Sequence, residues 1–300
     1  MTGRPIVLFQ IDGGDREDWL GAAARAWPES RAIWAPDASS ADLAAATVAI
    51  VWRPPGGFLG SLPSLRIVVS TAAGLDHLAG DRSLPPTLPV LRRQDPATAA
   101  AMSEYVLAAV LAQHRDFPRY AADQAAGRWI PCPAPMAAER RVIVLGLGPL
   151  GLAAGALLAT VGFGVAGWSR SRKPDAAFPT LAGWETLHEA LSRADTLVNL
   201  LPSTPDTRGL LDGTRMDLLP AGATLVHAGR GDTLVLDELL ARLDTGRIGH
   251  AALDVLPEEP PPPASPLWHH PRVTLTPHIA ALPLPEPFLR WVAATLNTDL

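Results

Sequence analysis

The sequence has very little cysteine, lysine and tyrosine: of its 300 residues, one is cysteine (Cys132), one is lysine (Lys173) and two are tyrosine. A single cysteine excludes an intramolecular disulfide and a cysteine-based metal cluster, so we expect no metal site and a reducing, cytoplasmic compartment. Positive charge is also limited, because 25 basic residues stand against 30 acidic ones, a formal net charge of -5. Nucleic-acid and polybasic membrane binders need clustered positive charge, so we expect neither partner.

No stretch of the sequence is typical of a signal peptide or a membrane span. The apolar run Ile6–Phe9 is too short for a signal-peptide core. Residues 142–168 carry no charged side chain and are long enough to cross a bilayer, but they include seven glycines and one proline at turn positions. They divide into a strand (Val142–Leu145), a helix (Leu150–Thr160) and a second strand (Gly164–Ser169). Buried parallel strands and the helix between them are apolar throughout, so we expect no membrane span.

Short apolar runs alternate with helix-like segments in two series along the chain. The candidate strands of the first series are Ile6–Gln10, Thr47–Trp52, Arg66–Thr71 and Val90–Leu91. Those of the second series are Val142–Leu145, Gly164–Ser169, Thr196–Leu201, Thr224–Ala228, Gly249–Asp254 and Val273–Thr276. Such alternation is typical of parallel sheets covered by helices on both faces. At about 150 residues per domain, the sequence predicts two α/β domains, each a doubly wound parallel sheet.

We expect the boundary between the domains near Asp95-Pro96, residues that suit a helix N-cap and the first helical position. A long helix follows over Ala97–His114. Three apolar residues spaced four apart mark its buried stripe: Met102, Val106 and Val110. Pro118 is expected to end this helix, and residues 120–135 to form an arm or loop.

The strand Val142–Leu145 runs directly into residues 146–151, Gly-Leu-Gly-Pro-Leu-Gly, which fit the G-x-G-x-x-G pattern and open an apolar helix. The first glycine permits the tight turn, the second lets the backbone approach a pyrophosphate, and the third lets helix and strand pack closely. The helix N-terminus then offers unpaired N–H groups to the phosphates. The alternative is a glycine-rich turn that binds no ligand. The residues expected to bind a dinucleotide here are Gly146, Gly148, Pro149, Leu150 and Gly151.

The end of the next strand distinguishes NAD(H) from NADP(H). An NAD site usually has an acidic residue there, about 20 residues after the first glycine, to hold the ribose 2′-hydroxyl. Ser169 occupies that position here, and no carboxylate follows before Asp175. Three basic residues follow it instead: Arg170, Arg172 and Lys173. Guanidinium groups pair well with phosphate, so we predict NADP(H) in preference to NAD(H); a solvated basic loop is the alternative.

Three charged residues follow the C-terminal ends of predicted strands, where open α/β sheets bind ligands: Arg230, Glu259 and His278. A guanidinium, a carboxylate and an imidazole together suit the reduction of a 2-keto acid. Arg230 would hold the substrate carboxylate and polarise the carbonyl, His278 would protonate the oxygen as hydride reaches carbon, and Glu259 would orient the imidazole and favour its protonated form. Taken singly, each has a structural alternative, and we assign the neighbouring His269 and His270 to structure.

Together these motifs resemble the D-isomer-specific 2-hydroxyacid dehydrogenases over nearly the whole chain. The segments that follow the order and spacing of that family are the glycine turn, Leu201–Thr207, Arg230-Gly231, Leu253-Asp254-Val255, Glu259-Pro260 and Thr276-Pro277-His278. The subgroup that the chain resembles most is the bacterial glyoxylate/hydroxypyruvate reductase A type. This similarity lies in residues 51–55 (Val-Trp-Arg-Pro-Pro) and 168–173 (Trp-Ser-Arg-Ser-Arg-Lys).

The resemblance implies a Rossmann cofactor domain over residues 95–283 and a flavodoxin-like substrate domain made of residues 1–94 and 284–300. The active site is then expected in the cleft between them. The implied reaction is the NADPH-dependent reduction of a small 2-keto acid, with glyoxylate or hydroxypyruvate as the first candidates. Members of the family are usually homodimers, joined through the cofactor domain and the helix and arm of residues 97–135.

The resemblance also implies roles for individual residues. Arg230 binds the substrate, Glu259 and His278 form the acid/base pair, and Asp254 positions the nicotinamide carboxamide. Further cofactor contacts are expected from Pro202 and Thr207. Substrate contacts in the first domain are expected from Trp52, whose alternative is a buried aromatic at a strand end, and from backbone N–H groups of the loop residues Ala73, Gly74 and Leu75.

Several positions depart from the family pattern. His227 stands where asparagine is common, and Ala72-Ala73 replaces Gly-Ala. Residues 282–285, Leu-Pro-Leu-Pro, replace a segment that often contains arginine. The loss of that arginine would favour a more apolar keto acid. Glu258 competes with Glu259 as the acid partner, and Glu259 is preferred because the family's Glu-Pro pairing falls there. Two alternatives therefore remain: a dehydrogenase for a larger or aromatic keto acid, and an NADP(H)-sensing binding protein without catalysis.

Overall fold

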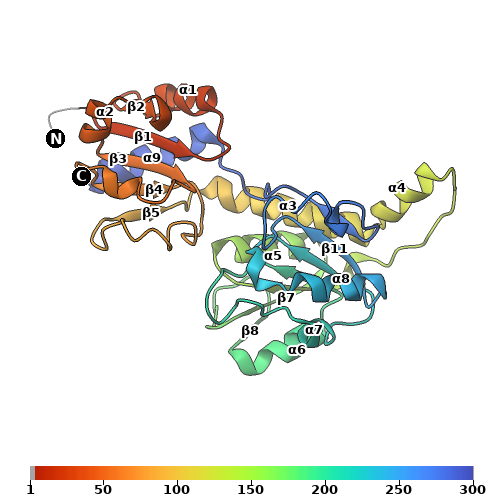
Figure 1. Cartoon of the computed structure of the whole chain (residues 1–300). Helices are drawn as coiled ribbons and strands as arrows, with labels where there is room; N and C mark the ends of the chain where they lie inside the picture. Colours follow the sequence, from red (N-terminus) through yellow and green to blue (C-terminus); the bar gives the residue numbers. More distant parts are fainter. Residues whose placement is uncertain (1–3, 300) are drawn as a thin grey trace. The chain divides into compact units, whose positions relative to one another are not determined.

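The structure, a computed structural model, describes residues 4–299, and the chain divides into two compact units. The first unit consists of Met1–Thr98 and Pro283–Leu300, and the second of Ala99–Leu282. Each unit contains one parallel sheet with helices around it (Figure 1). The predicted fold class, two doubly wound parallel-sheet α/β domains, is therefore confirmed.

The sheet of the first unit has the strand order β2-β1-β3-β4-β5, and every pairing is parallel. This is the flavodoxin-like order. Its strands are β1 (Ile6–Ile11), β2 (Arg31–Trp34), β3 (Val48–Trp52), β4 (Ile67–Ser70) and β5 (Val90–Arg92). The sequence predicted all of these except β2. That strand lies at the sheet edge and none of its residues is fully buried, so it has no strong apolar pattern.

Both faces of this first sheet are covered. On one face, α1 (Arg16–Ala26) and α9 (Pro285–Asp299) pack over Phe9 and Ile50. The Trp19 ring of α1 meets the Phe288 ring of α9 edge-on, with centroids 5.8 Å apart. The opposite face carries the alternate strand residues Leu8, Ala49 and Val51. The elements near that face are η1 (Ala35–Asp37), α2 (Ser40–Ala45) and η2 (Leu59–Ser61).

The sheet of the second unit has the order β12-β11-β10-β9-β6-β7-β8, again all parallel. Apart from β12 at one edge, this is the Rossmann order. The strands are β6 (Arg141–Leu145), β7 (Gly164–Ser169), β8 (Thr180–Ala182), β9 (Thr196–Asn199), β10 (Ala223–His227), β11 (Ile248–Leu253) and β12 (Val273–Leu275). The sequence missed only β8, a short edge strand without a buried residue.

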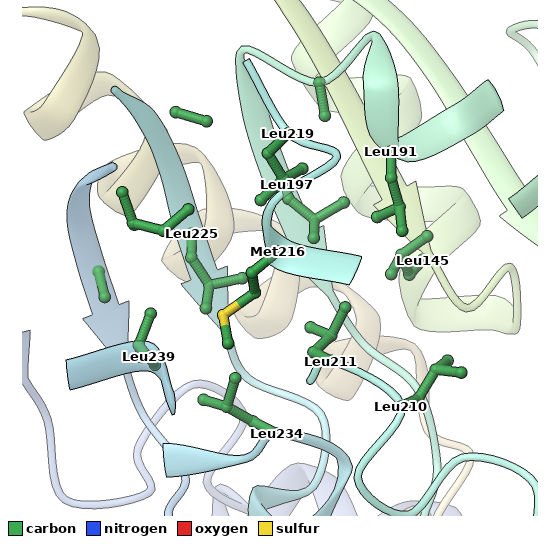
Figure 2. Packing of buried hydrophobic residues seen from close by; sticks show 14 of the residues in the cluster. Leu145, Leu191, Leu197, Leu210, Leu211, Met216, Leu219, Leu225, Leu234 and Leu239 are labelled. Atoms are coloured by element: carbon green, nitrogen blue, oxygen red, sulfur yellow. The ribbon is translucent and has the colours of Figure 1, made fainter. Parts of the chain in front are cut away.

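Successive residues of the central strand β6 enter two separate cores. Val142 and Val144 pack with α3 (Pro96–His114) and α5 (Pro149–Val161). Ile143 and Leu145 pack on the other face. Figure 2 shows that second core, where Leu145, Leu197 and Leu225 of the strands meet Leu191, Met216 and Leu239. The elements on that side are η4 (Trp184–Thr186), α6 (Leu187–Ser192), α7 (Gly213–Met216) and α8 (Leu236–Asp244).

The long helix α3 begins as predicted, because the Asp95 carboxylate accepts a hydrogen bond from the Thr98 N–H at 3.1 Å. The predicted stripe is buried: Met102, Val106 and Val110. The prediction for the segment after it is partly wrong. Pro118 lies in the first turn of another helix, α4 (Phe117–Ala125), where its missing N–H is not needed. Asp116, in the left-handed conformation with φ 59°, separates the two helices. Residues 128–136 form the expected loop.

No helix within residues 4–299 combines the length and the apolar content needed to cross a bilayer. The uncharged stretch that begins after Arg141 folds instead as β6, α5 and β7, as the sequence predicted. Its glycines lie where strand and helix meet, so its apolar side chains enter the two cores of the sheet.

Candidate active site

Five strands of the second unit end side by side at one edge of the sheet. The in-register partners at their ends are Leu145–Asn199, Asn199–His227, His227–Leu253 and Leu253–Leu275. Open α/β sheets bind ligands at the carboxyl ends of their strands. The loops that carry the predicted cofactor-binding and catalytic residues of this unit therefore all start at this edge.

The glycine turn between β6 and α5 has the geometry that a bound pyrophosphate needs. A Cβ on Gly151 would lie 2.0 Å from the Gly146 carbonyl oxygen, so helix and strand approach too closely for any larger residue. At Gly148, by contrast, a Cβ would meet nothing within 4 Å, which leaves the turn open on that side. Within residues 4–299, no side chain caps the N-terminus of α5. Its first N–H groups therefore suit the phosphates of a dinucleotide.

The basic segment after β7 starts at the same edge. Ser169 is buried and donates its hydroxyl hydrogen to the Ser171 carbonyl at 2.7 Å. The Arg170 guanidinium reaches Asp206 at 3.3 Å, although both side chains are largely exposed. Within the described residues, Arg172 and Lys173 form no ion pair. Cationic side chains therefore follow directly after the position where an NAD site usually has its acid.

Hydrogen bonds of the Thr207 side chain fix the conformation of the loop after β9. Thr207 is buried, and its hydroxyl donates to the Pro202 carbonyl at 2.5 Å. The same hydroxyl accepts the Thr204 N–H at 2.8 Å. These two bonds close residues 202–207 into a compact turn with Pro202 exposed. The predicted cofactor contacts of Pro202 and Thr207 stay predictions.

The structure brings Glu259, and not Glu258, to the imidazole of His278. Nδ1 of His278 lies 2.9 Å from one Glu259 carboxylate oxygen, and the other oxygen accepts the Leu256 N–H at 3.1 Å. His278 is in the left-handed conformation, with φ 55°. A non-glycine residue held there costs about 1–3 kcal/mol, so surrounding contacts must hold this backbone.

Those contacts come from Asp254, the residue that follows β11. Its main-chain carbonyl accepts the His278 N–H at 2.9 Å. Asp254 is buried, with 2% of the residue exposed. Its carboxylate accepts hydrogen bonds from the N–H groups of Ile279 at 2.8 Å and Ala280 at 2.9 Å. The carboxylate also accepts the Thr276 hydroxyl at 2.7 Å. In the structure the Asp254 carboxylate thus holds the loop of His278. The expected contact of Asp254 with the nicotinamide carboxamide stays a prediction.

The main chain on each side of Arg230 packs closely against a neighbouring loop, Gly229 against Leu201 and Gly231 against Leu256. A Cβ on Gly231 would lie 2.0 Å from the Leu256 carbonyl carbon, so the segment packs directly against the loop that leads to Glu259. The Arg230 carbonyl accepts the hydroxyl of Thr233 at 2.7 Å and its N–H at 3.1 Å. The guanidinium donates to the Gly229 carbonyl at 2.9 Å.

A buried network that the sequence did not reveal supports this segment. The Asn199 amide donates to His227 Nδ1 at 3.0 Å and to the Thr233 hydroxyl at 2.9 Å, and all three residues are fully buried. Nδ1 of His227 must then be the acceptor, which places the ring proton on Nε2. Burial lowers the pKa of His227 from 6.5 to about 4, so this imidazole is neutral at physiological pH. The sequence carried a signal for this network, because Asn199 and His227 are polar residues at the ends of largely apolar strands.

The predicted substrate residues of the first unit lie around the ends of β3 and β4. The Trp52 ring lies 4.8 Å from the His77 ring, and the Arg53 guanidinium stacks 5.0 Å from the Trp52 centroid. The Ser70 hydroxyl accepts the Ala72 N–H at 3.1 Å, which fixes the start of the loop. The three expected backbone donors are half-buried: Ala73, Gly74 and Leu75. Their contacts with substrate stay predictions.

The fold and the glycine turn define a dinucleotide-binding enzyme, and comparisons with known proteins identify its class. The family model described as "D-isomer specific 2-hydroxyacid dehydrogenase, NAD binding domain" matches residues 107–280. The chain belongs to the D-isomer-specific 2-hydroxyacid dehydrogenase family. The resemblance found in the sequence is therefore confirmed, and so is the prediction that the protein is an NAD(P)-dependent enzyme.

Solved structures of the same family are similar over almost the whole chain. A dehydrogenase of this family from Xanthobacter autotrophicus Py2, in complex with NADPH and MES, is 36% identical with a TM-score of 0.91, covering 98% of this chain and 94% of that one. The NADPH-dependent glyoxylate/hydroxypyruvate reductase from Sinorhizobium meliloti, with NADP and sulfate, is 32% identical with a TM-score of 0.92, covering 99% and 96%. A probable 2-hydroxyacid dehydrogenase from Rhizobium etli CFN 42, with NADP, HEPES and L(+)-tartaric acid, is 31% identical with a TM-score of 0.88, covering 99% and 95%.

Proposed function

We propose that this enzyme reduces a small 2-keto acid, glyoxylate or hydroxypyruvate first, to the 2-hydroxy acid with NADPH. The observation that carries the proposal is the pair of His278 and Glu259, whose Nδ1 and carboxylate oxygen lie 2.9 Å apart at the ligand-binding edge of a dinucleotide-binding sheet. A carbonyl that accepts hydride needs a proton on its oxygen, and an imidazole backed by a carboxylate supplies one.

Each residue of the pair and of the Arg230 segment has a defined task. The bond from Nδ1–H to Glu259 fixes Nε2 of His278 as the nitrogen that gives its proton to the substrate oxygen. Glu259, held by the Leu256 N–H, stabilises the protonated ring. Arg230 grips the substrate carboxylate and polarises the carbonyl through its fork of N–H donors. When bound, the nicotinamide cofactor supplies the hydride.

NADP(H) is the preferred cofactor in this proposal. Ser169 leaves the position of the usual acid uncharged, and the basic side chains after it suit a 2′-phosphate. The NADPH and NADP complexes of the Xanthobacter and Sinorhizobium proteins point the same way. The proposed cofactor contacts are Gly146, Gly148, Pro149, Leu150, Gly151, Ser169, Arg170, Arg172, Lys173, Pro202, Thr207 and Asp254.

The residues after His278 favour one second candidate, a larger or aromatic keto acid. Ile279 and Leu282 are 42% and 55% exposed, and apolar side chains this open suit an apolar substrate group.

Residues proposed to contact substrate in the first unit are Trp52, Ala73, Gly74 and Leu75. We propose that residues 1–94 and 284–300 act as the substrate domain and residues 95–283 as the cofactor domain.

NADPH oxidation measured against a panel of 2-keto acids, from glyoxylate to phenylpyruvate, tests the function. We expect the highest kcat/KM with glyoxylate or hydroxypyruvate, and a clear preference for NADPH over NADH. His278→Ala should bind NADPH as the wild type does but lose about 10²–10⁴-fold in kcat, the usual contribution of a general acid. Unchanged kcat would remove His278 from the mechanism. Tight NADPH binding without turnover of any keto acid would instead favour a cofactor-sensing protein.

We further propose that the enzyme is a cytoplasmic homodimer, joined through the second unit and the arm that contains α4. The support is the exposure of large apolar side chains on and after α4: Phe117 at 61%, Trp129 at 97%, Ile130 at 49% and Met136 at 72%. Large apolar side chains exposed along one segment suit a protein interface. Sedimentation analysis should give twice the mass of one chain.

A further inference from the structure

A chain of hydroxyl groups leads from α3 to the loop of His278. Tyr105 on α3 lies with its hydroxyl 2.8 Å from the Thr276 hydroxyl oxygen, which lies 2.7 Å from the Asp254 carboxylate. An ionised carboxylate can only accept, so the single hydroxyl hydrogen of Thr276 is directed to Asp254. Tyr105 must then donate to Thr276. Both hydroxyl hydrogens therefore point toward the carboxylate.

The end of this chain is the group that holds the catalytic loop. The Asp254 carboxylate binds the N–H groups of Ile279 and Ala280, and its main-chain carbonyl binds that of His278. Three consecutive N–H groups thus converge on one residue while His278 adopts a left-handed backbone. A rotation of the carboxylate would release two of the three, and the imidazole would move with them. The Thr276 hydroxyl is the side-chain donor that opposes this rotation.

We infer that Tyr105 and Thr276 are positioning residues of the reduction, which act through Asp254 to fix the imidazole of His278. This inference rests on the proposed function, in which His278 is the proton donor. The acid/base pair is left chemically intact when either hydroxyl is removed, so a defect must arise from position alone. Burial raises the pKa of Tyr105 to about 12, so its hydroxyl remains a donor throughout the working pH range.

Thr276→Val, Thr276→Ser and Tyr105→Phe, measured with NADPH and glyoxylate, test the inference. Thr276→Val removes the donor to Asp254, and we expect kcat to fall about 10–50-fold, within the range that a general acid contributes. Thr276→Ser restores the hydroxyl and should keep kcat within about 3-fold of the wild type, whereas Tyr105→Phe should cost about 3–10-fold, because one bond of the chain is lost. KM for NADPH should not change in any of them.

Two further readouts separate position from general damage to the fold. With 4-deuterated NADPH, Thr276→Val should show a larger primary isotope effect on kcat than the wild type, because the chemical step becomes slower. In the cofactor-free proteins, amide hydrogen exchange of residues 278–280 should be faster in Thr276→Val and unchanged in Thr276→Ser. Thr274→Val is the matched control: Thr274 lies two residues before Thr276, on β12, and its hydroxyl lies 3.0 Å from Nε2 of His250, so kcat and this exchange should stay as in the wild type.

The inference is overturned if Thr276→Val keeps the kcat and exchange of the wild type, or if Thr276→Ser falls as far as Thr276→Val. If Thr276→Val does not fold, Tyr105→Phe becomes the test. The inference is then contradicted if Tyr105→Phe has the kcat of the wild type, or if only its KM for NADPH changes. If the wild type turns over no keto acid, the proposed function fails, while the exchange measurement still reports whether the hydroxyl chain holds the loop.

Discussion

Mild acidification should destabilise this protein through two buried histidines, His227 and His250. Burial lowers the pKa of each from 6.5 to about 4. For His250, the nearby imidazole of His270 contributes to this lowering of the pKa, after burial. Nδ1 of His227 accepts a hydrogen bond from the Asn199 amide, so protonation there would set two donors against each other. Between about pH 4 and pH 6.5, these two histidines therefore take up a proton in the unfolded chain but not in the folded chain.

The sign and size of the effect follow from linkage. Because the folded pKa lies below the unfolded value, the stabilisation is complete above about pH 6.5 and is lost as the pH falls toward 4. At pH 5 the unfolded chain is favoured by a factor of about 30 for each such histidine, which corresponds to about 2 kcal/mol. Both together should lower the free energy of unfolding by about 4 kcal/mol between pH 7 and pH 5.

Urea unfolding at pH 7 and pH 5, at one ionic strength, measures this difference. His227→Asn keeps an acceptor for Asn199 and should reduce the loss by about 2 kcal/mol, whatever it does to stability at pH 7. His269→Gln is the matched control, since His269 is exposed and its variant should lose as much stability as the wild type. If His227→Asn loses as much as the wild type between these pH values, the buried imidazole is not the cause.

Two further predictions test the site. Gly151→Ala would place a Cβ 2.0 Å from the Gly146 carbonyl oxygen, so we expect NADPH binding weakened at least about 10-fold and a lower Tm; unchanged binding in a titration would contradict the close packing. Glu259→Gln removes the charge beside Nδ1 of His278 and should lower kcat about 10–100-fold, whereas Glu258→Gln should leave it within about 2-fold. A larger loss in Glu258→Gln than in Glu259→Gln would reverse the assignment.

The amino-acid sequence by itself determined the features that depend on neighbouring residues. The apolar runs predicted all strands except two short edge strands, β2 and β8, and Asp95 caps α3 as expected. The glycine pattern of residues 146–151 marked the nucleotide turn, because only glycine tolerates the close approach of α5 to β6. Helix α4 was missed, because Pro118 signals a helix start as readily as an end.

The tertiary structure alone decided which polar groups meet. Tyr105 and Thr276 are 171 residues apart in the chain, and Asn199 and Thr233 are 34 apart, so nothing in the local sequence pairs them. The family's Glu-Pro pairing already favoured Glu259 over Glu258, but only the fold shows which carboxylate the loop turns toward His278. Such partners are set by strand register and by the direction in which each loop leaves the sheet. The types of catalytic side chain are thus evident from sequence, while the hydrogen bonds that hold them in place arise only when distant strands pair.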